Sequence, residues 1–170
     1  MSRQLLILRH AKSAWDTDAF NDFDRPLNKR GKKDAPRVGA WLHEQGLTPG
    51  YVISSPAERA KQTVLKAARE LGIKKKQIHW DSRIYDAGTS TLLEVLAGCP
   101  ADAKTVLLVG HNPGLEYLVE YLCDNVDAPP DGKLLPTATV ARLAMPDVWD
   151  HLEPGAARLL GITRPRSLES

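Results

Sequence analysis

The sequence predicts a three-layer α/β/α fold, with helices covering both faces of a mostly parallel β-sheet. Two observations predict it. Short apolar runs alternate along the chain with segments whose apolar residues recur at helical spacing. The 170 residues also contain no internal repeat and no linker long enough to divide them. We therefore expect one domain over residues 1–170, with residues 163–170 forming a flexible tail.

Five strands are expected. Four of them are short apolar runs, and the fifth alternates apolar and polar residues as an antiparallel edge strand does. Their ranges are residues 4–9, 51–54, 78–80, 105–109 and 139–143.

Four helices are expected between these strands, each placed by a start signal. Asn28 caps a helix that reaches about residue 45. Ser55, Pro56 and Glu58 form a capping-box pattern ahead of a helix that ends near residue 71. The other two begin at Thr91, reaching residue 98, and at Pro113, reaching residue 122; residues 14–30 and 127–136 are expected as loops.

The composition excludes several classes of protein. The 23 basic and 21 acidic residues leave a net charge of +2, which argues against nucleic acid or an anionic membrane as the main partner. No stretch has the length of a membrane span, and residues 1–9 do not resemble a secretory leader. Cys99 and Cys123 are expected as buried thiols rather than a disulfide. We therefore expect a cytoplasmic protein.

Phosphate-compatible side chains follow three of the predicted strands. Arg9 and His10 end the first strand, Arg59 lies in the first helical turn after the second, and His111 follows residues 105–109. Because the carboxyl ends of parallel strands share one edge of the sheet, these groups are expected in one crevice. Guanidinium groups bind phosphate oxygens bidentately, and neutral imidazole attacks phosphorus. This constellation predicts phosphoryl transfer.

Other catalytic machinery is absent from the sequence. There is no phosphate-binding Gly-rich loop with Lys and Ser or Thr, and no dinucleotide-binding glycine pattern. Cys and His residues do not have zinc-site spacing. Ser54 and Ser55 lack the flanking glycines of a nucleophile elbow, which argues against a serine hydrolase.

Four blocks of the chain resemble those of a known family. Residues 8–13 read LRHAKS, residues 25–31 read RPLNKRG, residues 54–63 read SSPAERAKQT, and residues 110–113 read GHNP. In this order they resemble the histidine phosphatase (phosphoglycerate-mutase-like) superfamily, with Ala11 in place of the usual glycine. The most similar subgroup is the short SixA-type phosphohistidine phosphatases. The resemblance implies a phosphoglycerate-mutase-like fold.

The resemblance also implies roles for individual residues. It implies that His10 is the nucleophile, that Arg9, Arg59 and His111 form the phosphate pocket, and that the backbone N–H of Asn112 joins them. The family uses no metal ion or organic cofactor. These implications agree with the phosphoryl-transfer chemistry that the residues themselves suggest.

One departure bears on the substrate. Mutase-like and many phosphomonoesterase members of the family carry a carboxylic acid after the third strand, where this chain has Arg83. Asp86 lies nearby and is the candidate proton donor. An imidazole leaving group needs less protonation than an alkoxide, so a missing acid favours phosphohistidine over phosphoesters. Only about 50 residues separate Arg59 from His111, which predicts an open site.

The sequence therefore predicts a metal-independent phosphatase. We expect it to hydrolyse phosphohistidine on a protein, such as a histidine phosphotransfer or carrier domain, through a covalent phospho-His10 intermediate. A small-molecule phosphomonoesterase of the same fold is one alternative, and a non-catalytic phosphate- or phosphoprotein-binding module is another. A monomer is expected, with neither nucleic acid nor a membrane as partner.

Overall fold

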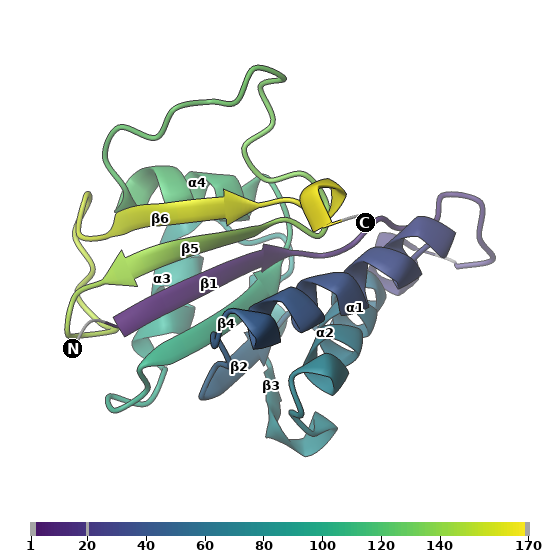
Figure 1. The fold of residues 1–170 in the computed structure, drawn as a ribbon, viewed down its shortest axis with the longest axis horizontal. Coiled ribbons are helices and arrows are strands. Elements are labelled where there is room, and N and C mark those ends of the chain that lie inside the picture. The colour runs from purple at the N-terminus through teal and green to yellow at the C-terminus, as the bar shows by residue number, and fades with distance from the viewer. Residues whose placement is uncertain (1–2, 20, 169–170) are drawn as a thin grey trace.

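The computed structural model describes residues 3–19 and 21–168, which form a six-stranded sheet with helices on both faces (Figure 1). The strands are β1 (Arg3–Arg9), β2 (Tyr51–Ser54), β3 (Ile78–Trp80), β4 (Thr105–Gly110), β5 (Val140–Met145) and β6 (Arg158–Thr163). Their order in the sheet is β3-β2-β4-β1-β5-β6. The first four strands pair in parallel, whereas β5 is antiparallel to both β1 and β6.

The predicted fold class is confirmed: the sheet is mostly parallel, with antiparallel pairing at one edge. That edge contains two strands, because β6 pairs outside β5 and was not predicted from the sequence. Most side chains of β6 are only partly buried, and Gly161 interrupts its pattern. Without alternation between a buried and an exposed face, the segment lacks the period-2 signal that identifies a strand.

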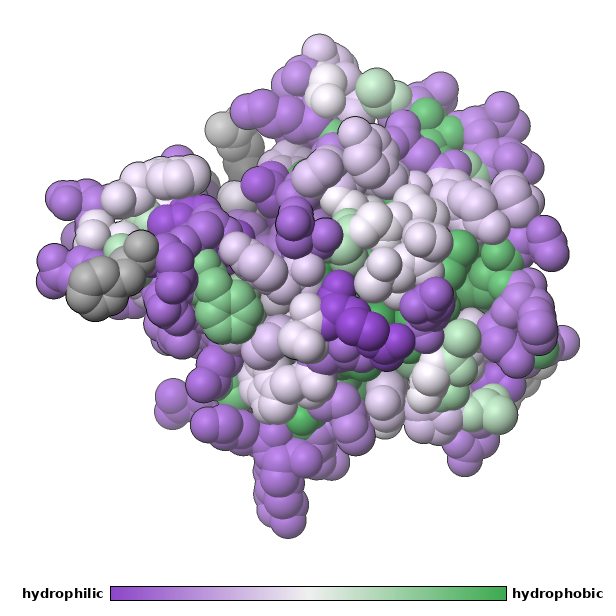
Figure 2. Space-filling view, turned by 180° about the vertical axis from the view of Figure 1, so that it is seen from behind, coloured by the Kyte–Doolittle hydropathy of each residue, from purple (hydrophilic) through white to green (hydrophobic). Residues whose placement is uncertain are grey.

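The four predicted helices are present. They are α1 (Lys29–Glu44), α2 (Glu58–Glu70), α3 (Thr89–Ala97) and α4 (Gly114–Leu122). Figure 1 shows α1 and α2 on one face of the sheet and α3 and α4 on the other. Seen from behind, the surface carries small apolar patches among hydrophilic residues (Figure 2).

Each face of the sheet has its own apolar core, and β1 contributes to both. Leu5 and Ile7 belong to the cluster that includes α3 and α4, whereas Leu6 and Leu8 belong to the cluster that includes α1 and α2. All four side chains are fully buried. A central parallel strand covered on both faces is expected to be apolar throughout, and this explains the run Leu5–Leu8.

The helix-start predictions have mixed outcomes. Asn28 caps α1 as predicted, with its side chain accepting from the N–H of Gly31 at 2.9 Å. The capping box is wrong, because α2 begins at Glu58 and Ala57 occupies the cap position without a side-chain hydrogen bond. The Thr91 start is also wrong: α3 follows Gly88 and begins two residues earlier, at Thr89. Both starts differ from the prediction by two residues, the range over which helix ends fray.

The segment expected as a tail contains regular structure. Residues 158–163 form β6, and a short 3-10 helix, η4 (Pro165–Leu168), contacts α1. Arg164 donates to both carboxylate oxygens of Asp131, at 2.8 and 3.1 Å. Residues 169–170 lie outside the described part of the chain. No helix among the described residues is long and apolar enough to cross a membrane.

A close backbone contact at Gly31 gives a stability prediction. A Cβ atom at this position would lie 2.1 Å from the carbonyl oxygen of Lys12, so Gly31→Ala forces the start of α1 away from the loop after β1. We expect the free energy of unfolding to fall by about 1–3 kcal/mol, measured by chemical denaturation. Gly50→Ala is the control, because nothing lies within 4 Å of its added methyl group. Equal stability of the two variants would contradict the prediction.

Candidate active site

The register of the two central strands brings His10 and His111 together. Arg9 on β1 pairs with Gly110 on β4, and the N–H of His10 donates to the carbonyl of Gly110 at 3.0 Å. The next residue of each chain segment is therefore a histidine at the same edge of the sheet. Their ring centroids are 5.2 Å apart, and the two residues are only 6% and 9% exposed.

His10 has a defined tautomer. Its Nδ1 lies 2.7 Å from the carbonyl oxygen of Ala11, which can only accept a hydrogen bond. Nδ1 therefore carries the proton, and the lone pair of the neutral ring is on Nε2. Burial is the main cause that lowers the pKa of His10 from 6.5 to about 3. The ring is thus neutral at physiological pH, with Nε2 3.4 Å from Nε of Arg59.

The turn after His10 is fixed by α2. The N–H of Ala11 donates to Oγ1 of Thr63 at 2.9 Å, and this hydroxyl donates to the carbonyl of Arg59 at 2.7 Å. Ala11 is fully buried and is not among the residues with positive φ. An alanine therefore fits this position, where the related family usually has glycine.

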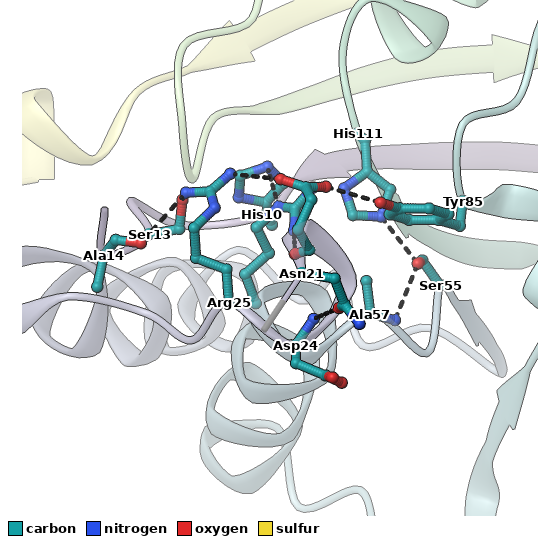
Figure 3. Close-up of polar contacts among 12 residues, drawn as sticks. His10, Ser13, Ala14, Asn21, Asp24, Arg25, Ser55, Ala57, Tyr85 and His111 are labelled. Atoms are coloured by element: carbon teal, nitrogen blue, oxygen red, sulfur yellow. Dashed lines mark hydrogen bonds and ion pairs between the residues drawn. The ribbon is translucent and has the colours of Figure 1, made fainter. Parts of the chain in front are cut away.

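Ser55 fixes the orientation of His111. Its Oγ lies 2.8 Å from Nε2 of His111 and accepts from the N–H of Ala57 at 3.2 Å (Figure 3). The other ring nitrogen, Nδ1, is buried and has no hydrogen-bond partner among the described residues. Burial is the main cause that lowers the pKa of His111 to about 4. Sequence reasoning placed Ser55 at a helix start and missed this contact, because β2 and β4 are neighbours only in the folded sheet.

Arg59 projects from the first turn of α2 into the site, where it meets Asp22. Its two terminal nitrogens donate to the backbone oxygen of Asp22 at 2.7 Å and to Oδ2 of the same residue at 2.8 Å. Asp22 begins a 3-10 helix, η1 (Asp22–Asp24), in the loop between β1 and α1. The guanidinium donors that suit phosphate oxygens are therefore occupied by Asp22, one by its backbone oxygen and one by its carboxylate.

Asp22 has two further partners. Its carboxylate accepts from the Tyr85 hydroxyl at 2.7 Å and from Arg25 at 3.1 Å (Figure 3). These hydrogen bonds, with that of Tyr85 contributing most, hold the pKa of Asp22 well below its usual range. The expectation that residues 14–30 form a solvated loop missed Asp22. A usable signal was its position three residues before Arg25, the first residue of a family-like block.

Arg9 and Asn112 lie where the site meets the loop of residues 127–139. Arg9 donates to the carbonyl of Leu135 at 3.1 Å, and the Asn112 side-chain amide donates to the same oxygen at 2.8 Å. Both side chains are thus held by this loop. The expected role of the Asn112 backbone N–H remains a prediction.

Asp86, the candidate proton donor, makes no hydrogen bond or ion pair with any described residue of the site. It is exposed and adopts a left-handed backbone conformation, with φ of 58°. Its neighbour Tyr85 reaches the site instead, with its ring edge-on to His111 and the centroids 5.4 Å apart. Asp81, the other nearby acid, pairs with Arg83 at 2.7 Å.

The arrangement suits an oxyanion better than a metal ion. Within residues 3–19 and 21–168, no three His, Cys, Asp or Glu side chains gather as metal ligands. Buried guanidinium groups, a neutral imidazole whose Nε2 lone pair faces Arg59 and a second buried imidazole are instead groups that suit phosphoryl transfer.

Comparisons with known proteins agree with this chemistry. The profile of the histidine phosphatase superfamily (branch 1) matches residues 5–88. The uncharacterized protein Rv1276c of Mycobacterium tuberculosis is 32% identical over 164 residues, which cover 94% of this chain and all of that protein.

Solved structures show the same similarity. A candidate phosphohistidine phosphatase SixA from Nakamurella multipartita superposes with a TM-score of 0.84 at 28% identity, covering 97% of each chain. The mycobacterial glucosyl-3-phosphoglycerate phosphatase Rv2419c superposes with a TM-score of 0.64 at 17% identity, covering 94% of this chain and 98% of that one. The second likeness shows a shared fold alone.

The lowered pKa values of the two histidines predict a pH-dependent stability. Between pH 6.5 and 4.5 the unfolded chain takes up protons on these residues that the folded protein does not bind. The free energy of unfolding should therefore fall on acidification by up to about 1.4 kcal/mol per pH unit for each histidine. Denaturant titrations at several pH values should show that the free energy of unfolding depends less steeply on pH in His10→Asn/His111→Asn than in the wild type. His43→Asn/His151→Asn, which changes two exposed histidines, is the control. The prediction is wrong if His10→Asn/His111→Asn leaves the pH dependence of the free energy of unfolding unchanged.

The contact between Asp22 and Arg59 predicts competition with anions. Asp22→Asn removes the charge that occupies the guanidinium, so inorganic phosphate should bind more tightly, by up to about fivefold, since a half-exposed ion pair contributes about 0.2–1 kcal/mol. Calorimetric titration measures this affinity. Asp24→Asn, in the same loop, should leave it unchanged, because the Asp24 carboxylate has no partner among the described residues. Weaker phosphate binding by Asp22→Asn would mean that Asp22 holds Arg59 in its binding position.

Proposed function

Because this chain belongs to the histidine phosphatase superfamily, we propose that it hydrolyses phosphohistidine on a protein through a phosphorylated His10. The observation that carries the proposal is the hydrogen bond between Nδ1 of His10 and the Ala11 carbonyl. It holds the lone pair on Nε2, beside Arg59, in a ring that burial keeps neutral. A neutral imidazole in this state is a nucleophile ready to attack phosphorus.

The first step transfers the phosphoryl group to the protein. Nε2 of His10 forms a bond to phosphorus, the P–N bond of the substrate breaks, and its electron pair leaves with the substrate imidazole. Phosphoryl oxygens replace the Asp22 carboxylate on Arg59, and Arg9 adds a second positive charge. If the Ser55 hydroxyl donates to Nε2 of His111, the unpartnered Nδ1–H of His111 is a further donor to these oxygens.

The second step releases phosphate. Water attacks phosphorus, the bond between phosphorus and Nε2 of His10 breaks, and the electron pair returns to Nε2. The Nδ1 proton stays on the ring throughout, because the Ala11 carbonyl holds it. His10 thus leaves as a neutral imidazole in the tautomer required for the next cycle. The proton of the attacking water passes to the released phosphate or to solvent.

The leaving group supports phosphohistidine as the substrate. Hydrogen bonds keep Asp22 ionised, so it has no proton to donate, and Asp86 makes no contact with the histidines. An alkoxide needs a proton as it leaves, whereas an imidazole already protonated at its far nitrogen leaves readily. The likeness to proteins named SixA also supports a phosphorylated protein, such as a phosphotransfer or carrier domain, as the partner.

Phosphoester hydrolysis is the second candidate function. The fold is shared with a mycobacterial glucosyl-3-phosphoglycerate phosphatase, an enzyme named for a small-molecule substrate. In that case a proton donor is required, and Asp86 is the residue that we would assign to it. A binding module without turnover is the third candidate. The neutral ring of His10, with its lone pair on Nε2, argues against it, because phosphate binding alone does not require a nucleophile.

We also propose that the protein acts in the cytoplasm as a monomer. Cys99 and Cys123 are both buried as free thiols. Burial raises the pKa of each thiol to about 11, which keeps them protonated and unreactive. Buried unpaired thiols suit a reducing compartment.

One panel of substrates tests the proposed function. We expect phosphate release from a phosphohistidine carrier protein to exceed that from phosphomonoesters, since no acid assists an alkoxide. His10→Ala should abolish turnover and the acid-labile phosphoenzyme, whereas Asp86→Asn should leave phosphohistidine hydrolysis within about twofold, because an imidazole leaving group needs no acid. A preference for phosphoesters that is lost in Asp86→Asn would favour the second candidate, and no turnover of any substrate would favour the third.

A further inference from the structure

Two adjoining grooves run away from the histidines along the loop of residues 127–139. The first, of about 510 Å³, begins at Arg9 and Asn112. The second, of about 670 Å³, ends at Arg164. Both are lined by Lys12 and by the segment that contains Lys133, Pro136 and Thr137. We call the two together the basic trough, a continuous path from the phosphate pocket to the end of β6.

The basic trough carries unbalanced positive charge. Five basic and three acidic side chains line it: Arg9, Lys12, Arg30, Lys133, Arg164, Asp34, Glu116 and Asp131. The carboxylates are already engaged. Asp34 pairs with Arg30 at 3.1 Å, and Asp131 pairs with Arg164 at 2.8 Å. Glu116 accepts from the backbone of Leu135 at 2.8 Å and lies near Arg9, where its charge partly opposes the lowering of the Arg9 pKa by burial.

Lys12 and Lys133 are the two cations of the trough whose ammonium groups pair with no carboxylate among the described residues. Asp131 lies near Lys133, but Arg164, which does most to lower the pKa of this carboxyl group, already binds it. Both lysines are exposed, and neither ammonium group has a hydrogen bond or an ion pair within the described part of the chain. Because they line the stretch that the two grooves share, the excess charge lies in the middle of the trough. An exposed cation in a polar groove attracts an anionic partner.

The backbone beneath both lysines is fixed. The carbonyl of Lys12 accepts from the N–H of Asn28 at 2.9 Å, at the start of α1. At Lys133 the N–H donates to Asp131 at 3.0 Å, and the carbonyl accepts from Arg164 at 2.7 Å. The backbone that carries the two exposed lysines is therefore already ordered, so a ligand does not have to order it on binding.

We propose that the basic trough binds an acidic segment of the substrate protein, adjacent in sequence to its phosphohistidine. This inference rests on the proposed function. The two grooves, of about 510 and 670 Å³, offer far more room than a second phosphate or carboxylate of a small substrate occupies. An extended peptide advances about 3.3 Å per residue and can follow such a path. Lys12 and Lys133 then contact acidic side chains of the bound segment, while Arg59 and His10 handle the phosphoryl group.

Synthetic peptides with one phosphohistidine test the proposal. One peptide carries a glutamate-rich segment beside the phosphohistidine, a second carries a neutral segment and a third a lysine-rich segment. For the wild type, kcat/KM should be highest for the acidic peptide and lowest for the basic one. Lys12→Gln/Lys133→Gln should lower kcat/KM for the acidic peptide about fivefold to tenfold at low salt, because two exposed ion pairs are lost. The loss should shrink in 0.5 M NaCl.

Matched controls separate the trough from the catalytic pocket. Lys75→Gln/Lys76→Gln makes the same charge change at exposed residues before β3, at the other edge of the sheet, and should have no effect. Hydrolysis of free phosphoramidate should be unaffected by Lys12→Gln/Lys133→Gln. Hydrolysis of all three peptides at equal rates would overturn the proposal while leaving the proposed function intact. A loss of phosphoramidate hydrolysis in that double variant would also overturn it, since Lys12 would then belong to the phosphate pocket. No turnover of any phosphohistidine peptide would instead refute the proposed function itself.

Discussion

The site depends on the parallel pairing of β1 with β4. This pairing aligns Arg9 with Gly110, so that the next residue on each strand is a histidine. A shift of one residue in this register would exchange the two faces of β1, so that Leu5 and Ile7 would have to repack against α1 and α2 in a close-packed core. The two apolar clusters therefore enforce the register, and the register places the imidazoles 5.2 Å apart. Core packing and catalytic geometry have the same origin.

Burial then determines the protonation states. Desolvation lowers the pKa of both histidines, and nearby guanidinium groups act in the same direction. A charged imidazolium would repel Arg59, whereas a neutral ring lies beside it without penalty. Hydrogen bonds orient both rings: His10 donates from Nδ1 to the carbonyl of Ala11, and Nε2 of His111 bonds to the hydroxyl of Ser55. The neutral, oriented pair therefore follows from the surroundings more than from the histidines themselves.

Acidic groups divide the positive charge around the site into two regions. In the phosphate pocket, Asp22 engages Arg59 and Arg25 and neutralises part of their charge before a ligand arrives. In the basic trough the carboxylates have other partners, and Lys12 and Lys133 are left exposed. In the proposed reaction, the phosphoryl group of the substrate would replace the Asp22 carboxylate on Arg59. The proposed flanking segment would meet the exposed ammonium groups of Lys12 and Lys133.

The sequence by itself determined the alternation of strands and helices, because apolar periodicity is local. It also placed His10, Arg59 and His111 at strand ends that meet at one edge of the sheet, since that follows from parallel topology. Only the tertiary structure decided that Asp22, Tyr85 and Ser55 belong to the site. These contacts join residues 37 to 63 positions apart in the sequence, and no local pattern records such pairings. For the same reason β6 was missed: its place in the sheet comes from pairing with β5, not from a pattern of its own.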